Sequence, residues 1–208
     1  MRVLLADDHV ILRDALKALL EREGLDVVGT ASDGRAAVAA VRQLVPDVVV
    51  LDVAMPEMNG VDAAREITRA CPGTHVILLT GLDDARFVPQ ALQAGVRGFV
   101  LKTQGAEDLL RAIQAVHRGA LYVSPGACQA VVDAFSGTGA PVAERLSPRE
   151  REVVQLVAEG KSTKQIAQVL AISVKTAEFH RGRIMGKLDI HDTAGLVRYA
   201  VREGLIAP

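Results

Sequence analysis

The feature that most constrains the fold is a regular alternation of short apolar runs with longer helical patterns over residues 1–121. Five runs rich in Val, Leu and Ile predict strands at Val3–Ala6, Val27–Ala31, Val48–Leu51, Val76–Thr80 and Gly98–Leu101. Helical patterns lie between and after them at residues 10–23, 34–44, 60–70, 84–94 and 105–118. Continuous apolar runs are typical of strands buried on both faces of a parallel sheet. The pattern therefore predicts an α/β doubly wound, five-stranded parallel sheet in the order 2-1-3-4-5.

The rest of the chain predicts a linker and a second, all-α domain. Ser124-Pro125 is typical of a helix start, so a linker helix is expected at residues 124–135. The Gly- and Ser-containing residues 136–141 then predict a flexible connection. After it only helical patterns remain, the first opening with a capping box from Ser147 to Glu150. The predicted domains are a doubly wound domain at 1–121, a linker at 122–144 and a domain of four short helices at 145–208.

Charge is distributed unevenly between these parts. Residues 1–144 carry 13 basic and 18 acidic side chains, whereas residues 145–208 carry 11 and 7. A basic C-terminal domain favours an anionic partner. Cys71 and Cys128 are too few for a disulfide framework or a cysteine metal site. No apolar run approaches the roughly 20 residues that cross a bilayer, so we expect a cytoplasmic protein without a membrane partner.

Polar side chains gather just past the predicted strands. Asp7 and Asp8 follow the first strand, Asp52 the third and Lys102 the fifth, while Thr80 ends the fourth. The carboxyl ends of parallel strands meet at one edge, where such sheets bind ligands. Neighbouring carboxylates repel one another, and Mg²⁺ relieves that repulsion. Each residue alone could be an ordinary strand-end side chain, but five together predict a site for Mg²⁺ and a phosphoryl group.

Residues 1–121 closely resemble the receiver domain of response regulators. The resemblance rests on Leu-Ala-Asp-Asp-His at 5–9, Leu-Asp-Val-Ala-Met-Pro-Glu-Met-Asn-Gly at 51–60, Leu-Leu-Thr at 78–80 and Gly-Val-Arg-Gly-Phe-Val-Leu-Lys at 95–102. It implies that Asp52 accepts a phosphoryl group from a sensor histidine kinase or a small phosphodonor, and that Lys102 pairs with the phosphoryl oxygens. Such a chain is not an enzyme in the usual sense, although it can dephosphorylate itself.

The same resemblance implies a Mg²⁺ site and a switch. Asp8, Asp52 and the backbone carbonyl of Ala54 would hold the ion, with Asp7 binding a metal-bound water. Thr80 would move toward the phosphoryl group, and Phe99 would turn inward behind it. Phe99 can equally be a plain core aromatic, and because it lacks a hydroxyl, only a packing form of the coupling remains.

Residues 145–208 closely resemble the LuxR-type helix-turn-helix. The matching stretches are 146–153, 159–167, 172–176 and 187–188. A receiver followed by this module is the arrangement of the NarL/FixJ group of two-component transcription regulators. The resemblance therefore implies that double-stranded DNA is the anionic partner and that phosphorylation controls its binding.

The second helix of such a motif lies in the major groove. Here it begins after Ser173, and its spacing predicts that Ala177, Ile184 and Leu188 face inward. Glu178 could accept from a cytosine or merely pair with a neighbouring Lys, and Phe179 could touch a thymine methyl. The leading phosphate contacts are Lys164, Thr176, Arg183 and Lys187. The full set of expected DNA contacts is Lys164, Lys175, Thr176, Glu178, Phe179, His180, Arg183 and Lys187.

The last helix carries an apolar stripe, and the resemblance implies that active homodimers form through it. The stripe comprises Leu196, Val197, Ala200 and Val201. The alternative is that it closes the module's own core. RNA polymerase is a further candidate partner. Two other readings stay open: a phosphate relay or adaptor whose C-terminal helices bind protein, and a transcription factor that works without phosphorylation.

Overall fold

The chain, described here from a computed structural model, forms two compact units that divide close to residue 140. The structure describes residues 1–81, 87–135 and 146–206. The expected flexible connection at 136–141 lies outside the described residues, as do residues 84–86 of the predicted fourth helix. No helix in the described ranges is long and apolar enough to span a bilayer.

The N-terminal unit is built on a parallel sheet whose strands are β1 (Arg2–Ala6), β2 (Asp26–Ala31), β3 (Val48–Asp52), β4 (His75–Thr80), β5 (Gly98–Leu101) and β6 (Tyr122–Val123). Their order is β2-β1-β3-β4-β5-β6, so the predicted order of the first five strands is confirmed. The prediction of five strands misses β6. This strand pairs with β5 because the backbone N–H of Tyr122 donates to Arg97 and that of Ser124 to Phe99, at 2.9 and 2.8 Å.

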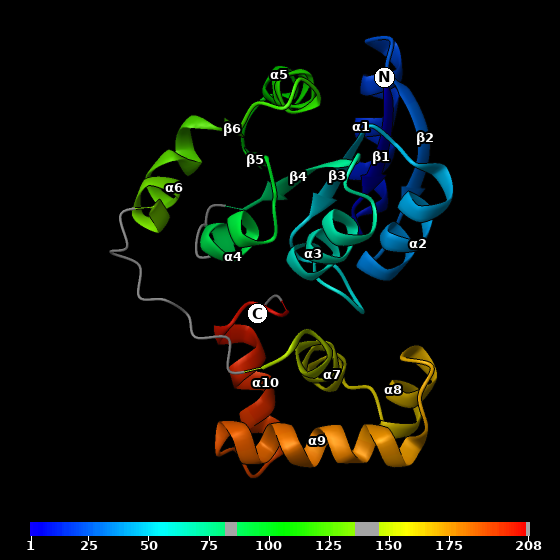
Figure 1. Ribbon diagram of the computed structural model, residues 1–208, viewed down its shortest axis with the longest axis vertical. Coiled ribbons are helices and arrows are strands. Elements are labelled where there is room, and N and C mark those ends of the chain that lie inside the picture. Colours follow the sequence, from blue (N-terminus) through cyan, green and yellow to red (C-terminus); the bar gives the residue numbers. More distant parts are fainter. Residues whose placement is uncertain (82–86, 136–145, 207–208) are drawn as a thin grey trace. The chain divides into compact units, whose positions relative to one another are not determined.

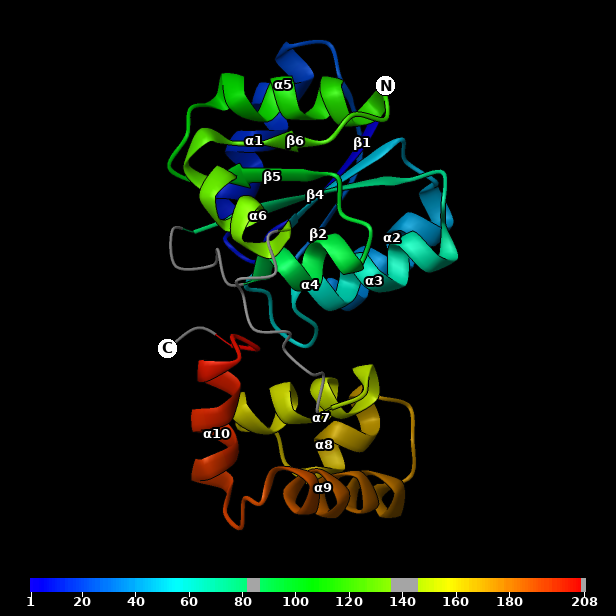
Figure 2. The same ribbon diagram turned by 60° about the vertical axis from the view of Figure 1, so that its left-hand side comes forward.

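Helices cover both faces of this sheet. They are α1 (Val10–Arg22), α2 (Gly34–Leu44), α3 (Gly60–Ala70), α4 (Val88–Gln93) and α5 (Ala106–His117). Helices α1 and α5 lie on one face, and α2, α3 and α4 lie on the other (Figures 1 and 2). On the α1–α5 side, Leu20, Leu109 and Ile113 pack against alternate strand residues. Alternation of side chains along each strand supplies apolar groups to both faces. Pro89 lies in the first turn of α4, where a proline is tolerated because an N–H there would have no partner within the helix.

The segment after β6 stays with the N-terminal unit. A 3-10 turn, η2 (Pro125–Ala127), leads into α6 (Cys128–Phe135), which packs against α4. The expected helix at 124–135 is thus a turn followed by a shorter helix. Ser124 does not cap it with its side chain, because the hydroxyl donates instead to the Asp108 carboxylate on α5.

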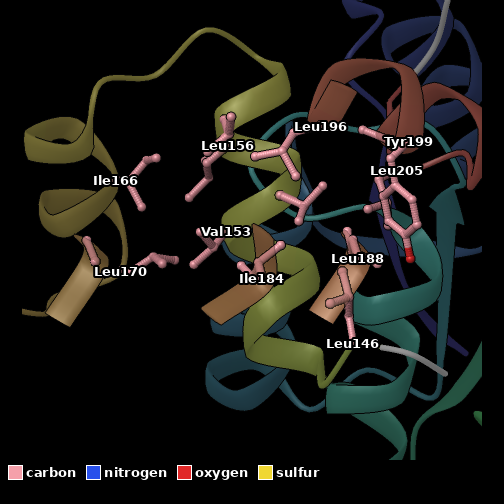
Figure 3. Close-up of a cluster of buried hydrophobic side chains, with 14 of the residues drawn as sticks. Leu146, Val153, Leu156, Ile166, Leu170, Ile184, Leu188, Leu196, Tyr199 and Leu205 are labelled. Atoms are coloured by element: carbon pink, nitrogen blue, oxygen red, sulfur yellow. The ribbon is translucent and has the colours of Figure 1, made fainter. Parts of the chain in front are cut away.

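The C-terminal unit consists of α7 (Pro148–Ala158), α8 (Thr163–Val169), α9 (Val174–Leu188) and α10 (Thr193–Arg202). The prediction of four short helices is confirmed. Capping boxes start α7 at Ser147 with Glu150, and α8 at Ser162 with Gln165. Figure 3 shows side chains from all four helices meeting in one apolar core, with Val153 and Leu156 of α7 central to it.

Candidate functional site

The polar residues predicted to share a site meet at the carboxyl edge of the sheet. Asp52 ends β3, and Asp7 and Asp8 follow β1, the strand beside it. Lys102 follows β5, and its ammonium Nζ lies 2.8 Å from Asp52 Oδ2 and 3.1 Å from Asp7 Oδ2. Thr80 ends β4 and is buried. All five are thereby placed on adjacent strand ends.

The Asp52 carboxylate is buried but paired. Burial raises its pKa from 3.8 to about 6, although the hydrogen bond and charge of Lys102 oppose this rise. The negative charge of Asp7 raises it further, and a backbone hydrogen bond from Ala54 lowers it. Burial lowers the pKa of Lys102, but its carboxylate partners outweigh burial and raise the pKa overall. At neutral pH the site therefore holds an ionised carboxylate beside an ammonium group.

The loop after β3 requires a glycine at position 60, because the chain passes very close to the backbone of Asp52 there. A Cβ there would lie 2.0 Å from the backbone oxygen of Asp52. The Gly60 N–H donates to the Val53 carbonyl at 2.9 Å, so the start of α3 packs directly against the backbone beside Asp52. Any side chain would push that loop away and displace the carboxylate.

The acidic cluster suits a hard divalent cation. Ligand atoms of Asp7, Asp8, His9 and Asp52 all lie within 4.8 Å of one another. Carboxylate oxygens are the ligands that Mg²⁺ prefers, often with waters completing its shell. The residues present therefore fit Mg²⁺.

His9 belongs to this site although it carries no role in the predicted set. Its Nδ1 lies 3.2 Å from Asp7 Oδ1 and 2.9 Å from Asp8 Oδ1. The imidazole is 69% exposed, so it lies at the surface beside the two acids. The sequence feature that could have identified His9 as a site residue is its position directly after Asp7 and Asp8.

Phe99 lies within the sheet and away from solvent. It is 1% exposed on β5, between Leu78 of β4 and Val123 of β6. This burial fits a core aromatic and equally fits a residue through which packing changes pass from β4 to β6.

The predicted DNA-facing helix has the expected division of faces. In α9, Ala177, Ile184 and Leu188 are buried in the core of the unit. Lys175, Glu178 and Arg183 are exposed. On the same outer surface Phe179 is 64% exposed, which is unusual for a large aromatic side chain. Lys164 is exposed on α8.

Other side chains predicted to contact DNA already contact neighbouring side chains of the C-terminal unit. Thr176 Oγ1 lies 2.8 Å from Ser173 Oγ at the start of α9. His180 is half-buried, its ring meeting that of Phe179 edge to face at 6.2 Å between centroids. Lys187 Nζ donates to Glu150 Oε2 at 2.7 Å. Glu150 lies 37 residues before Lys187 in the chain, so no local sequence pattern predicts this ion pair.

The predicted dimerisation stripe is divided between buried residues and residues that reach the surface. Leu196 and Ala200 are 1% and 0% exposed and pack in the core of their own unit. Their burial fits the alternative that the stripe closes the module's own core. Val197 and Val201 of α10 are half-buried and still reach the surface.

Both units match known families. The family described as "Response regulator receiver domain" matches residues 3–114, and "Bacterial regulatory proteins, luxR family" matches residues 144–200. A putative transcriptional regulator of Pseudomonas aeruginosa is 38% identical over 205 residues, which are 99% of each chain. The oxygen regulatory protein NreC of Staphylococcus carnosus is 35% identical over 215 residues, again 99% of each chain.

Solved structures give the same assignment. RcsB of Salmonella enterica serovar Typhimurium, bound to the promoter P1flhDC in the presence of the phosphomimetic BeF₃⁻, is similar with a TM-score of 0.62. The two chains are 30% identical, and the match covers 96% of this chain and 97% of RcsB. Acidic cluster, strand-end Lys and complete helix-turn-helix thus occur together in one chain, which belongs to the NarL/FixJ group of response regulators and is a phosphorylation-controlled, DNA-binding transcription regulator.

Proposed function

We propose that Asp52 is the residue that accepts the phosphoryl group, with a phosphohistidine of a sensor kinase as donor. The observation that carries the proposal is the 2.8 Å contact between Asp52 Oδ2 and Lys102 Nζ at the carboxyl edge of the sheet. A carboxylate oxygen would attack phosphorus, the phosphorus–nitrogen bond would break, and the imidazole would leave with its bonding pair. Lys102 would then pair with phosphoryl oxygens in place of the carboxylate.

Mg²⁺ is the proposed cofactor, held by Asp8, Asp52 and the Ala54 backbone carbonyl, with Asp7 binding through a water. The ion would neutralise charge on the phosphoryl oxygens. Asp7 and Lys102 keep the site polar and orient the Asp52 carboxylate. Ala54 is small and exposed beside that carboxylate, so water also reaches it, which favours self-dephosphorylation.

Thr80 and Phe99 form the proposed switch. Thr80 ends β4 and Phe99 lies on the neighbouring strand β5, so a shift of the hydroxyl toward the phosphoryl group would free space beside the sheet. Ser124 of the linker binds the Phe99 carbonyl, which extends the connection beyond the receiver. We assign the receiver to residues 1–121, the linker to 122–144 and the DNA-binding domain to 145–208.

DNA binding is assigned to the outer face of α9 together with Lys164 of α8. Lys175, Thr176 and Arg183 would meet phosphates, which positions the helix. Glu178, Phe179 and His180 are nearest to base edges in a major-groove orientation. Lys187 is the basic member of the expected set that lies nearest to a carboxylate, with its Nζ 2.7 Å from Glu150 Oε2, and Arg183 Nε lies 3.5 Å from the same side chain.

The active form is proposed to be a homodimer, since one such motif has a small footprint on DNA. Val197 and Val201 are the residues of α10 left for that contact. RNA polymerase is a candidate partner at the promoter. We place the protein in the cytoplasm, where the kinase domain and the DNA are both accessible.

Phosphorylation and its consequence are tested together with acetyl phosphate and Mg²⁺. Intact-mass measurement should show one added phosphoryl group on the parent and none on Asp52→Asn. DNA binding should tighten with the phosphodonor for the parent and stay unchanged for Asp52→Asn. Asp33→Asn, at the half-buried N-cap of α2, is the matched control and should behave as the parent. Equal regulation by Asp52→Asn would reject the switch, and no salt-dependent DNA binding would favour the adaptor reading.

A further inference from the structure

The helix-turn-helix unit contains a buried anion directly behind its basic surface. Glu150, at the third position of α7, has a side chain that is only 3% exposed. Its Oε2 accepts from Lys187 Nζ at 2.7 Å and from the Ser147 N–H at 2.8 Å. Its Oε1 lies 3.5 Å from Arg183 Nε. Two basic side chains of α9, four residues apart and therefore on one helix face, thus converge on one carboxylate.

This carboxylate stays charged. Burial raises the pKa of Glu150, but the hydrogen bonds from Lys187 and Ser147 outweigh burial, so that the pKa lies below its ordinary value. The cover is shallow, because the Arg183 and Lys187 side chains above it are themselves 58% and 34% exposed. Glu150 therefore acts from just beneath the surface that the recognition helix presents.

We infer that Glu150 is a positioning residue for DNA binding, which takes up the charge of Lys187 and fixes the guanidinium of Arg183. The trio carries one net positive charge where α9 alone would show two. A phosphate is then attracted at Arg183, and at Lys187 it meets a charge already neutralised. The basic face of α9 would therefore accept the DNA backbone in one register only. Other registers would need a phosphate at Lys187, whose charge Glu150 already neutralises.

The inference rests on the proposed use of α9 for DNA binding and makes a separate prediction about salt dependence. The logarithm of the binding constant falls with the logarithm of salt concentration, with a slope of about 0.9 per neutralised phosphate. The paired change Glu150→Gln with Lys187→Met removes one charge of each sign and should leave this slope unchanged on a random-sequence duplex. Lys175→Met, at an exposed lysine of the same helix, should lower it by about one.

Glu150→Gln tests the anion itself, and the chain offers a matched precedent for it. The second capping box, at Ser162, already uses Gln165 at the equivalent position. The substitution therefore preserves the cap and removes only the charge. Released Lys187 and Arg183 should raise the slope on random duplex by about one and tighten that binding severalfold. Preference for a duplex selected from a random pool by the parent protein should fall severalfold.

Ser147→Ala is the control for stability, because it removes a capping contact and keeps the ion pairs. It should lower the melting temperature without changing the slope. A slope that falls by about one in the paired variant, or stays unchanged in Glu150→Gln, would overturn the inference. If Glu150→Gln alone does not fold, the paired variant in the full chain, which leaves no unpaired charge behind, decides alone. Failure of the parent to bind either duplex would instead reject the proposed function.

Discussion

At the scale of single residues, Asp52 shows how much of a site follows from strand ends alone. The sequence is sufficient to predict that Asp7, Asp52 and Lys102 share one edge, because parallel strands end together. It is not sufficient to assign charges to partners across distance. Lys187 illustrates this, since Glu150 is far from it in the chain and becomes its partner only when α7 packs on α9.

Removing the Asp52 charge should stabilise the metal-free protein above pH 6. In the unfolded chain this carboxyl ionises near pH 3.8, whereas burial delays its ionisation in the fold to about pH 6. Stability is therefore lost as pH rises from about 4 to 6, and the loss persists at higher pH. In EDTA at pH 7.5, the free energy of unfolding of Asp52→Asn should be about 1–3 kcal/mol higher than that of the parent. This range follows from about 1.4 kcal/mol per pKa unit.

Urea unfolding across pH 4.5–8 measures this difference. The extra stability of Asp52→Asn should shrink toward acid pH, where the Asp52 carboxyl of the parent becomes protonated in the folded and the unfolded state. Added Mg²⁺ should stabilise the parent and narrow the gap at pH 7.5, because the ion binds the folded form. A difference that is constant with pH would show that Asp52 is not the titrating group.

At the scale of elements, β6 marks the limit of sequence-based prediction. Two residues are too few to show an alternating pattern, so the sequence alone places Tyr122-Val123 in the linker. What fixes the strand is Asp108 on α5, whose buried carboxylate accepts from Tyr122 Oη at 2.5 Å and also from Ser124 Oγ. Ser124 in turn accepts from the Leu101 N–H at 3.3 Å. The contacts join residues 14 and 16 positions apart, beyond any local rule.

Asp108→Ala should loosen β6 and the turn that follows. Ser124 is fully buried, and an unpaired buried hydroxyl costs about 1–3 kcal/mol. We expect the receiver to lose about 2 kcal/mol of stability and amide exchange at Tyr122 and Ser124 to accelerate, while exchange in β1 and β3 keeps its rate. Arg111→Ala, whose guanidinium is 66% exposed and 3.9 Å from Asp108, serves as the control. Unchanged exchange at Ser124 in the Asp108 variant would refute this anchoring.

At the scale of the whole molecule, the sequence predicts the order of the two units and the basic character of the DNA-binding unit. The proposed control by phosphorylation requires that the receiver restrain the DNA-binding unit until Asp52 is modified. Such a restraint acts through the chain between the units, since a tethered partner has an effective concentration that falls as about the −3/2 power of tether length. Residues 136–141, with Gly137 and Gly139, have the composition of such a tether.

Lengthening the stretch 136–145 about threefold with Gly and Ser should therefore weaken the restraint about fivefold by this power law. Unphosphorylated DNA binding should tighten by up to that factor, toward the affinity of the phosphorylated parent, which fluorescence anisotropy on the selected duplex measures. Phosphorylated binding should change less, because the restraint is already released. A replacement of equal length by Gly and Ser controls for composition. Should lengthening weaken both forms equally, the receiver would act by bringing two DNA-binding units together and not by holding one back.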